Sequence, residues 1–226
     1  MRIILAVAAV LTLFLPPGPA PARADTRVLE FEVRRGGAPI GTHRVAIREA
    51  GPRTEVEIEI DLAVRFAFLT VYRYTHRSRE SWEAGRLVAL DATTDDNGER
   101  TRVSARAAAD GLAVDGSGGR YVAPPGVAPT SYWRREKLER THLLDTQSGK
   151  LVAVANAALG SRAVPVDGAD APVDFYRVSG DLEAELGYAA DGSWAALAFE
   201  ARGARIDYRR VSALSQTGLA NTTSPR

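Results

Sequence analysis

The chain has 226 residues, with 29 lysines and arginines against 28 aspartates and glutamates, and it contains no cysteine. The absence of cysteine excludes a disulfide, a thiolate metal site and a cysteine nucleophile. A net charge of +1 argues against nucleic acid as the main partner. Its three histidines are too scattered for a metal motif, so the sequence predicts no metal and no cofactor.

Residues 1–24 have the pattern of a secretory signal peptide. Arg2 precedes an apolar run, and the small residues and prolines that follow end in Ala22-Arg23-Ala24, an A-x-A cleavage site. The apolar run of about 13 residues is shorter than the roughly 20 needed to span a bilayer. We therefore expect cleavage after Ala24, a periplasmic or secreted protein, and no transmembrane segment in the mature chain. An uncleaved membrane anchor is the alternative.

Alternating apolar and polar residues, bounded by glycine, aspartate and asparagine turns, recur along residues 25–212. This period of two predicts β-strands, and the short turns predict antiparallel hairpins. Residues 54–64, TEVEIEIDLAV, are the clearest strand, and Asp96-Asn97-Gly98 is the strongest hairpin signal. We expect a single all-β domain, a curved antiparallel meander or half-barrel.

Residues 124–150 interrupt this pattern. SYWRREKLERTHLL, residues 131–144, predicts one short helix capped by Ser131, with Glu136 and Arg140 four residues apart. The helix or crossover either covers the core or gates a concave surface, and it joins two sheet halves, 25–123 and 151–212. The polar tail, residues 213–226, is predicted to be disordered.

Residues 68–82, FLTVYRYTHRSRESW, place aromatic side chains on one face of a strand and arginines on the other. Pairing with residues 54–64 through a turn near Ala67 would oppose charges of opposite sign, which stabilises an antiparallel pair. The expected pairs are Asp61 with Arg73, Glu57 with Arg77, and Glu55 with Arg79. We therefore interpret the arginines as a solvated charge ladder and not as a ligand site.

The turn between these two strands contains none of the residues that favour turns. VRFAFLT, residues 64–70, lacks glycine, proline, asparagine and aspartate. Either the strand bends there through a bulge, or Phe66, Phe68 and Leu69 form what we call the apolar rim. The rim is either covered by another element or offered to a lipid or protein partner.

The face opposite the arginines carries the candidate ligand-binding residues. Apolar residues of the preceding strand (Val56, Ile58, Ile60 and Leu62) share this face, so a hydrophobic small molecule or lipid is the expected ligand. The crossover contributes two further aromatic residues. The candidates are Tyr72, Tyr74, His76, Glu80, Trp82, Tyr132 and Trp133. A buried histidine hydrogen-bonded to a tyrosine or carboxylate is the alternative interpretation of His76.

Two other functions stay open. A hydrolase could use His76 and Glu80 as acid and base, although four residues along a strand separate them by about 13 Å. A structural or assembly module could present a sheet edge or the apolar rim to another envelope protein. The sequence has no nucleophile elbow and no phosphate loop, so we assign no catalytic residue.

Five stretches together resemble a domain-of-unknown-function family of exported bacterial proteins. They are GGAPIGTHRVAI, YRYTHRSRESWEAGRLVAL, TSYW, LLDTQSGKL and YRVSGDLEAELGYAADGSWAALAF. The resemblance covers nearly all of the mature chain and implies an all-β periplasmic domain without an established activity. It also implies a curved sheet loosely similar to the half-barrels of lipoprotein carriers. We therefore expect a non-enzymatic envelope protein that binds a hydrophobic ligand, lipid or lipoprotein segment.

Overall fold

A computed structural model of the chain describes residues 25–216, with side chains described up to residue 211. The expected signal peptide and residues 217–226 of the expected tail lie outside the described residues. Within them, no helix is long and apolar enough to cross a membrane.

Fifteen strands and one 3-10 helix make up the described chain. The first part contains β1 (Asp25–Arg35), β2 (Ala38–Ala50), β3 (Arg53–Phe66), β4 (Leu69–Glu83), β5 (Arg86–Asp96), β6 (Glu99–Ala108), β7 (Gly111–Gly116) and β8 (Gly119–Ala123). The crossover contains β9 (Ala128–Pro129), the 3-10 helix η1 (Arg135–Glu139) and β10 (His142–Leu144). The last part contains β11 (Leu151–Val166), β12 (Ala169–Gly180), β13 (Ala184–Ala189), β14 (Trp194–Ala201) and β15 (Ala204–Gln216). Strand β15 thus extends past the expected domain end at residue 212.

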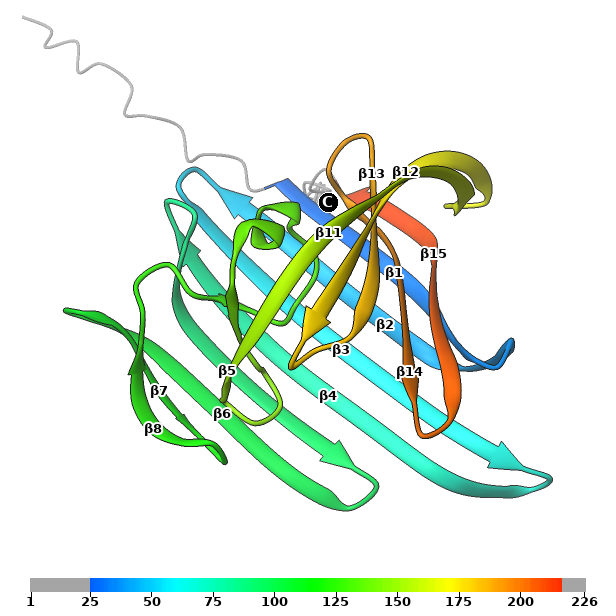
Figure 1. Ribbon diagram of the computed structural model, residues 1–226, viewed down its shortest axis with the longest axis horizontal. Helices are drawn as coiled ribbons and strands as arrows, with labels where there is room; N and C mark the ends of the chain where they lie inside the picture. Colours follow the sequence, from blue (N-terminus) through cyan, green and yellow to red (C-terminus); the bar gives the residue numbers. More distant parts are fainter. Residues whose placement is uncertain (1–24, 217–226) are drawn as a thin grey trace, which may run out of the picture.

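All strands belong to one sheet, in the order β8-β7-β6-β5-β4-β3-β2-β1-β15-β14-β13-β12-β11-β10-β9. Every neighbouring pair is antiparallel except β9 and β10. The two expected halves meet where β1 pairs with β15. Strands β11 to β13 cross in front of the broad sheet of β2 to β6 (Figure 1). The predicted all-β fold, a curved and open antiparallel meander, is confirmed.

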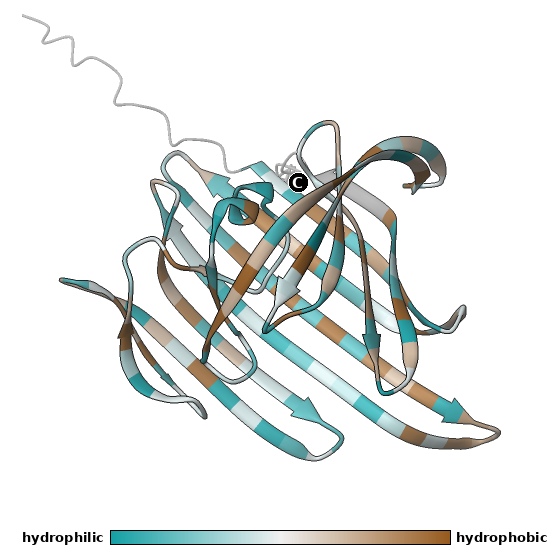
Figure 2. Ribbon diagram, viewed as in Figure 1, coloured by the Kyte–Doolittle hydropathy of each residue, from teal (hydrophilic) through white to brown (hydrophobic). Residues whose placement is uncertain are grey.

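The alternating pattern decides which side chains face the interior. On β3, Val56, Ile58 and Ile60 are buried, while Glu57 and Glu59 between them are exposed. Figure 2 shows the same alternation of hydrophobic and hydrophilic residues along the central strands. Apolar burial at roughly 25 cal/mol per Å² favours placing the even positions inward. The inward face of this sheet is therefore largely apolar.

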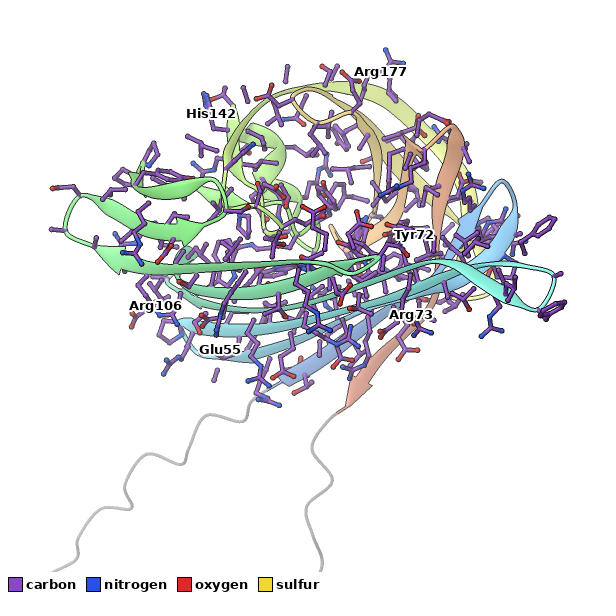
Figure 3. All side chains as sticks on the ribbon, turned by 90° about the horizontal axis from the view of Figure 1, so that it is seen from below. Glu55, Tyr72, Arg73, Arg106, His142 and Arg177 are labelled. Atoms are coloured by element: carbon purple, nitrogen blue, oxygen red, sulfur yellow. The ribbon has the colours of Figure 1, made fainter. Side chains whose placement is uncertain are left out.

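The predicted register between β3 and β4 was wrong by two residues. Glu57 pairs with Arg79 and Glu59 with Arg77, because the turn has only two residues and Val71 is an extra residue on β4 near the tip. A displacement by two keeps every side chain on its predicted face. The charge ladder is confirmed for Arg77 and Arg79, since Asp61 accepts two hydrogen bonds from Arg77 at 2.7 and 2.9 Å and Glu57 pairs with Arg79. The expected pair of Asp61 with Arg73 was wrong, because Arg73 lies opposite Ala63. Figure 3 shows Glu55, Arg73 and Arg106 on this outer face.

The helix predicted over residues 131–144 was wrong. Only the 3-10 turn η1 forms, and Arg134, not Ser131, precedes it in an extended conformation without a side-chain cap. The Ser131 hydroxyl accepts a hydrogen bond from Lys137 instead, and Glu136 pairs with Arg134 instead of Arg140. The residues on either side of the turn join the sheet edge through β9 and β10, which removes them from helix formation.

Candidate functional site

A cavity of about 810 Å³ lies between the inward face of the sheet and the elements that cover it. Its walls come mainly from β2, β3, β4, β14 and β15, with contributions from the loops of the crossover, from β11 and from the segment between β12 and β13. Most of the wall is aliphatic or aromatic. The apolar lining comprises Ile40, Ile58, Ile60, Leu62, Val64, Val71, Val152, Leu182, Leu197, Phe199 and Ile206.

The burial of the β3 side chains shows where this cavity opens. Ile58 and Ile60 are buried, whereas Leu62 and Val64 are half-buried, although all four line the cavity. Exposure therefore rises toward the β3–β4 turn, and the cavity mouth lies near that end of the hairpin.

An ion pair and an aromatic contact bridge the mouth. Arg202, in the β14–β15 turn, pairs with Asp96 at the end of β5, with 3.2 Å between Nη2 and Oδ2. The same guanidinium lies 4.8 Å from the centre of the Tyr72 ring. Burial and the Asp96 carboxylate raise the pKa of Tyr72 to about 12. We call Tyr72, Asp96 and Arg202 the mouth clasp, because they connect three elements at the opening.

Two neutral histidines line the cavity below the clasp. The Nδ1 atom of His76 lies 2.9 Å from the Thr94 hydroxyl, so its partner is neither a tyrosine nor a carboxylate. Burial lowers the pKa of His76 to about 4, and it lowers the pKa of His43 to about 3. His43 and His76 both pair with Ile60 and thus form one row across three strands.

His43 has an aromatic surrounding and no hydrogen-bond partner. Its ring lies 5.1 Å from that of Trp194, 5.6 Å from that of Tyr208 and 6.0 Å from that of Phe31. Neither of its ring nitrogens has a partner among the described residues. Leaving buried polar atoms unpaired destabilises a fold, so His43 is a candidate for a role beyond packing.

The other end of the inward face of β4 is filled. Glu80 is fully buried, and one of its oxygens, Oε2, accepts hydrogen bonds from the indoles of Trp82 at 2.9 Å and Trp133 at 3.0 Å. Its second oxygen, Oε1, has no partner in the described part of the chain. Lys137 is also buried, and burial lowers its pKa to about 7 against the opposing charge of Glu80.

The predicted site residues therefore divide into two groups. Tyr72, Tyr74, His76 and Tyr132 line the cavity. Glu80, Trp82 and Trp133 do not line it and form the filled end. His76 and Glu80 have separate hydrogen-bond partners, so the structure does not bring the proposed acid and base together.

The apolar rim is exposed and lies beyond the mouth. Relative exposure is 76% for Phe66, 91% for Phe68 and 57% for Leu69. No element of the described part of the chain covers the rim, so of the two alternatives the structure shows the exposed rim. The tip projects past the region of Tyr72 and Arg73 in Figure 3.

Sequence reasoning predicted Tyr72 but missed its partners Asp96 and Arg202 in the mouth clasp. It also missed His43 and the contact between Ser131 and Lys137. Extending the strand register from β3–β4 to β2–β3 would have placed His43 beside Ile60, so a signal existed for that residue. Arg202 and Asp96 are 106 positions apart and have no signal in the sequence.

The family described as Domain of unknown function (DUF6134) matches residues 31–211. No curated protein matches the chain. A solved structure is similar in fold, the crystal structure of a beta-barrel-like protein of domain of unknown function DUF1849 from Brucella abortus. The TM-score is 0.59 at 11% sequence identity, over 87% of this chain and 100% of the other.

Proposed function

Since the chain belongs to the DUF6134 family, whose description names no activity, we propose a function from the cavity: non-enzymatic binding of a hydrophobic ligand in the cell envelope. The ligand class is a lipid, or the lipid-bearing segment of a lipoprotein. The envelope location rests on the signal-peptide pattern of residues 1–24.

The observation that carries this proposal is the largely apolar cavity between the inward face of the sheet and the elements that cover it. Its volume of about 810 Å³ lies within the range of roughly 300 to 1,000 Å³ for small-molecule sites. Aliphatic walls come from the sheet and from the elements that cover it. Burying an acyl chain against them would contribute roughly 25 cal/mol for each Å² removed from water.

The polar groups of the cavity fit a ligand with one polar end. His43 and His76 are held neutral by burial, so the inward face of the sheet offers hydrogen-bonding groups without a fixed charge. The carboxylates that line the cavity lie on other elements; they are Asp96, Asp145, Asp181 and Glu183. Arg35 and Arg202 lie at the wall near the mouth, where a head group would meet solvent. A ligand would therefore enter with its chain inward and its head group at the mouth clasp.

Native mass spectrometry tests the proposal. The mature chain is purified from its export compartment without detergent, and bound material is extracted and weighed. We expect a stoichiometric adduct of lipid-like mass, which Leu62→Trp should lose because the indole would occupy the cavity. Glu59→Trp, on the outer face of the same strand, should keep the adduct. A bare protein mass together with no binding of an acyl probe would contradict lipid binding.

A second candidate function, ester hydrolysis, is favoured by one contact at the cavity wall. The Lys137 Nζ atom lies 3.1 Å from the Ser131 hydroxyl and 3.2 Å from the Pro129 carbonyl oxygen, and Ser131 lines the cavity. A hydroxyl beside a lysine of lowered pKa is an arrangement that activates a serine nucleophile. Lys137, with its pKa near 7, could accept the serine proton.

A serine-reactive fluorophosphonate separates the two functions. Labelling of the wild-type protein that is lost in Ser131→Ala and reduced in Lys137→Met would support hydrolysis. Thr146→Ala is the matched control, since this hydroxyl also lines the cavity but has no contact with Lys137 within hydrogen-bond distance. If the wild-type protein binds lipid but is not labelled, hydrolysis is contradicted and only the binding function is supported.

A further inference from the structure

We propose that the tip of the β3–β4 hairpin inserts the apolar rim into the interface of an anionic lipid bilayer. A lipid could then pass between the membrane and the cavity without crossing water. The purpose of this contact rests on the proposed function, while the contact itself rests on separate observations.

The first observation is the clustering of exposed apolar side chains at this tip. Phe66, Phe68 and Leu69 are joined by Val71, which is 52% exposed. The other large exposed apolar residues of the described chain lie singly on β8, β11 and β15; they are Val122, Leu159 and Val211. Contiguous exposed apolar surface marks an interaction site, whereas single exposed residues need no explanation.

The second observation is that the β3–β4 turn lacks the residues that favour a tight hairpin turn. The β4–β5, β5–β6 and β14–β15 turns each place a glycine second, and both turn residues have positive φ, as in Asn97-Gly98 at 54° and 98°. At the β3–β4 tip, Ala67 adopts a φ of 52° and Phe68 follows. A left-handed conformation is unfavourable for alanine. Phe68 does not have a positive φ, so Ala67 is the residue that stands where the hairpin itself would favour glycine.

The third observation is the charge around the tip, which indicates the kind of surface that the tip would contact. Residues 63–73 contain Arg65 and Arg73 and no acidic residue. Both arginines are exposed at the base of the tip. Aromatic side chains that reach the acyl boundary, with arginines at the level of the head groups, suit an anionic membrane surface. Two copies meeting tip to tip would oppose these arginines, so the charge favours lipid over a second copy.

The fourth observation is continuity between the tip and the cavity. Val64 and Val71, on the two strands of the hairpin, line the cavity wall within three residues of the rim. Tyr72 follows as part of the mouth clasp. The rim is therefore the outer edge of the same apolar surface that lines the cavity.

Vesicle flotation tests the inference with the mature chain. We expect the protein to float with vesicles of phosphatidylglycerol and phosphatidylethanolamine, and more weakly with phosphatidylcholine alone. The triple variant Phe66→Ser, Phe68→Ser, Leu69→Ser should lower partitioning at least tenfold. Val122→Ser is the control, at a residue of β8 that is about as exposed as Leu69, and it should change partitioning less than twofold. The unfolding midpoint of each variant checks that the fold is kept.

Binding of a fluorescent fatty acid in vesicle-free solution separates this inference from the proposed function. Retained probe binding in the triple variant, with vesicle binding lost, supports membrane docking. Probe binding by a wild-type protein that does not float would overturn docking and leave the cavity function. Vesicle binding without probe binding would contradict the cavity function alone. Unchanged flotation of the triple variant would overturn docking by the rim. Docking would also be overturned if the wild-type protein were a dimer and the triple variant a monomer.

Discussion

The inward face of β4 passes through two different environments. Tyr72, Tyr74 and His76 face the cavity, whereas the next residues of the same parity lead into a filled cluster around Glu80 and Trp82. Both regions come from one continuous alternation of residues on one strand. The cause of the difference lies outside the strand.

The crossover causes this difference, because Trp133 and Lys137 are buried at one end, whereas Ser131, Tyr132 and Thr146 line the cavity at the other. Trp133 donates a hydrogen bond to Glu80, and Lys137 is buried nearby, so charged groups at the filled end face groups that compensate them. The hollow end carries neutral histidines, one of which has no partner among the described residues. The filled end surrounds a buried carboxylate with two indole donors, whereas the hollow end combines apolar walls with a neutral histidine that has no partner among the described residues. This contrast is typical of a structural cluster beside a ligand site.

The largest expected effect comes from breaking the filled end. Glu80→Leu would leave two buried indole N–H groups and Lys137 without the carboxylate, so the free energy of unfolding should fall by about 3 to 5 kcal/mol. Urea unfolding followed by tryptophan fluorescence measures it. Glu57→Gln, in the exposed pair with Arg79, should cost less than about 1 kcal/mol. A loss below 1 kcal/mol for Glu80→Leu would show that the cluster is not structural.

The next largest effect is a pH dependence of the free energy of unfolding, caused by the two histidines of the hollow end. The folded pKa values of His43 and His76, about 3 and about 4, lie below the unfolded value of 6.5. As the pH falls, these histidines take up protons in the unfolded chain before they do so in the folded chain. The free energy of unfolding is therefore highest above pH 6.5 and decreases as the pH falls toward 4. From pH 7 to 5 the loss should reach roughly 2 to 4 kcal/mol.

Lys137 does not interfere in this pH window. Its pKa is lowered from 10.5 to about 7, so its contribution changes mainly between those values and is nearly constant below them. Urea unfolding at pH 7, 6 and 5 gives the slope, and His43→Phe should reduce it by about half. An identical slope in this variant would mean that folding does not lower the pKa of His43.

At pH 7 the same His43→Phe variant should have the opposite effect from Glu80→Leu. Phenylalanine keeps the contacts with Phe31, Trp194 and Tyr208 and removes two unpaired polar atoms. We expect a gain of about 1 to 2 kcal/mol in the free energy of unfolding. His76→Phe, which would break the hydrogen bond to Thr94, is the matched comparison and should not stabilise. Destabilisation by His43→Phe would indicate a hydrogen-bonded imidazole.

The smallest effect on stability concerns the mouth clasp. Arg202→Ala removes an exposed ion pair and the contact with Tyr72, which should cost less than about 1 kcal/mol. Release of a bound acyl probe should become about two- to fivefold faster, because the clasp crosses the opening. Stopped-flow dissociation measures this rate, with Arg205→Ala in the neighbouring pair with Asp207 as the control. Equal rates in both variants would exclude a gating role.

Particular residues show how far sequence reasoning reached. The alternation in residues 54–64 and 68–82 correctly predicted which side chains face inward, although the register was displaced by two. The helix prediction for residues 131–144 failed because the flanking residues join the sheet edge through β9 and β10, and Trp133 donates a hydrogen bond to Glu80 on β4. Parity placed Tyr72, Tyr74 and His76 on one face, but it could not separate them from Glu80 and Trp82.

The sequence by itself determined the all-β class, the hairpin order and the inward face, because strand periodicity and turn chemistry are local properties. Only the tertiary structure decided which half of that face is hollow, since this depends on where residues 124–150 cross the sheet. It also decided that the apolar rim is uncovered and that Arg202 reaches Asp96. Contacts between distant segments leave no periodic trace in a single chain, so a packed core and a lined cavity share one pattern.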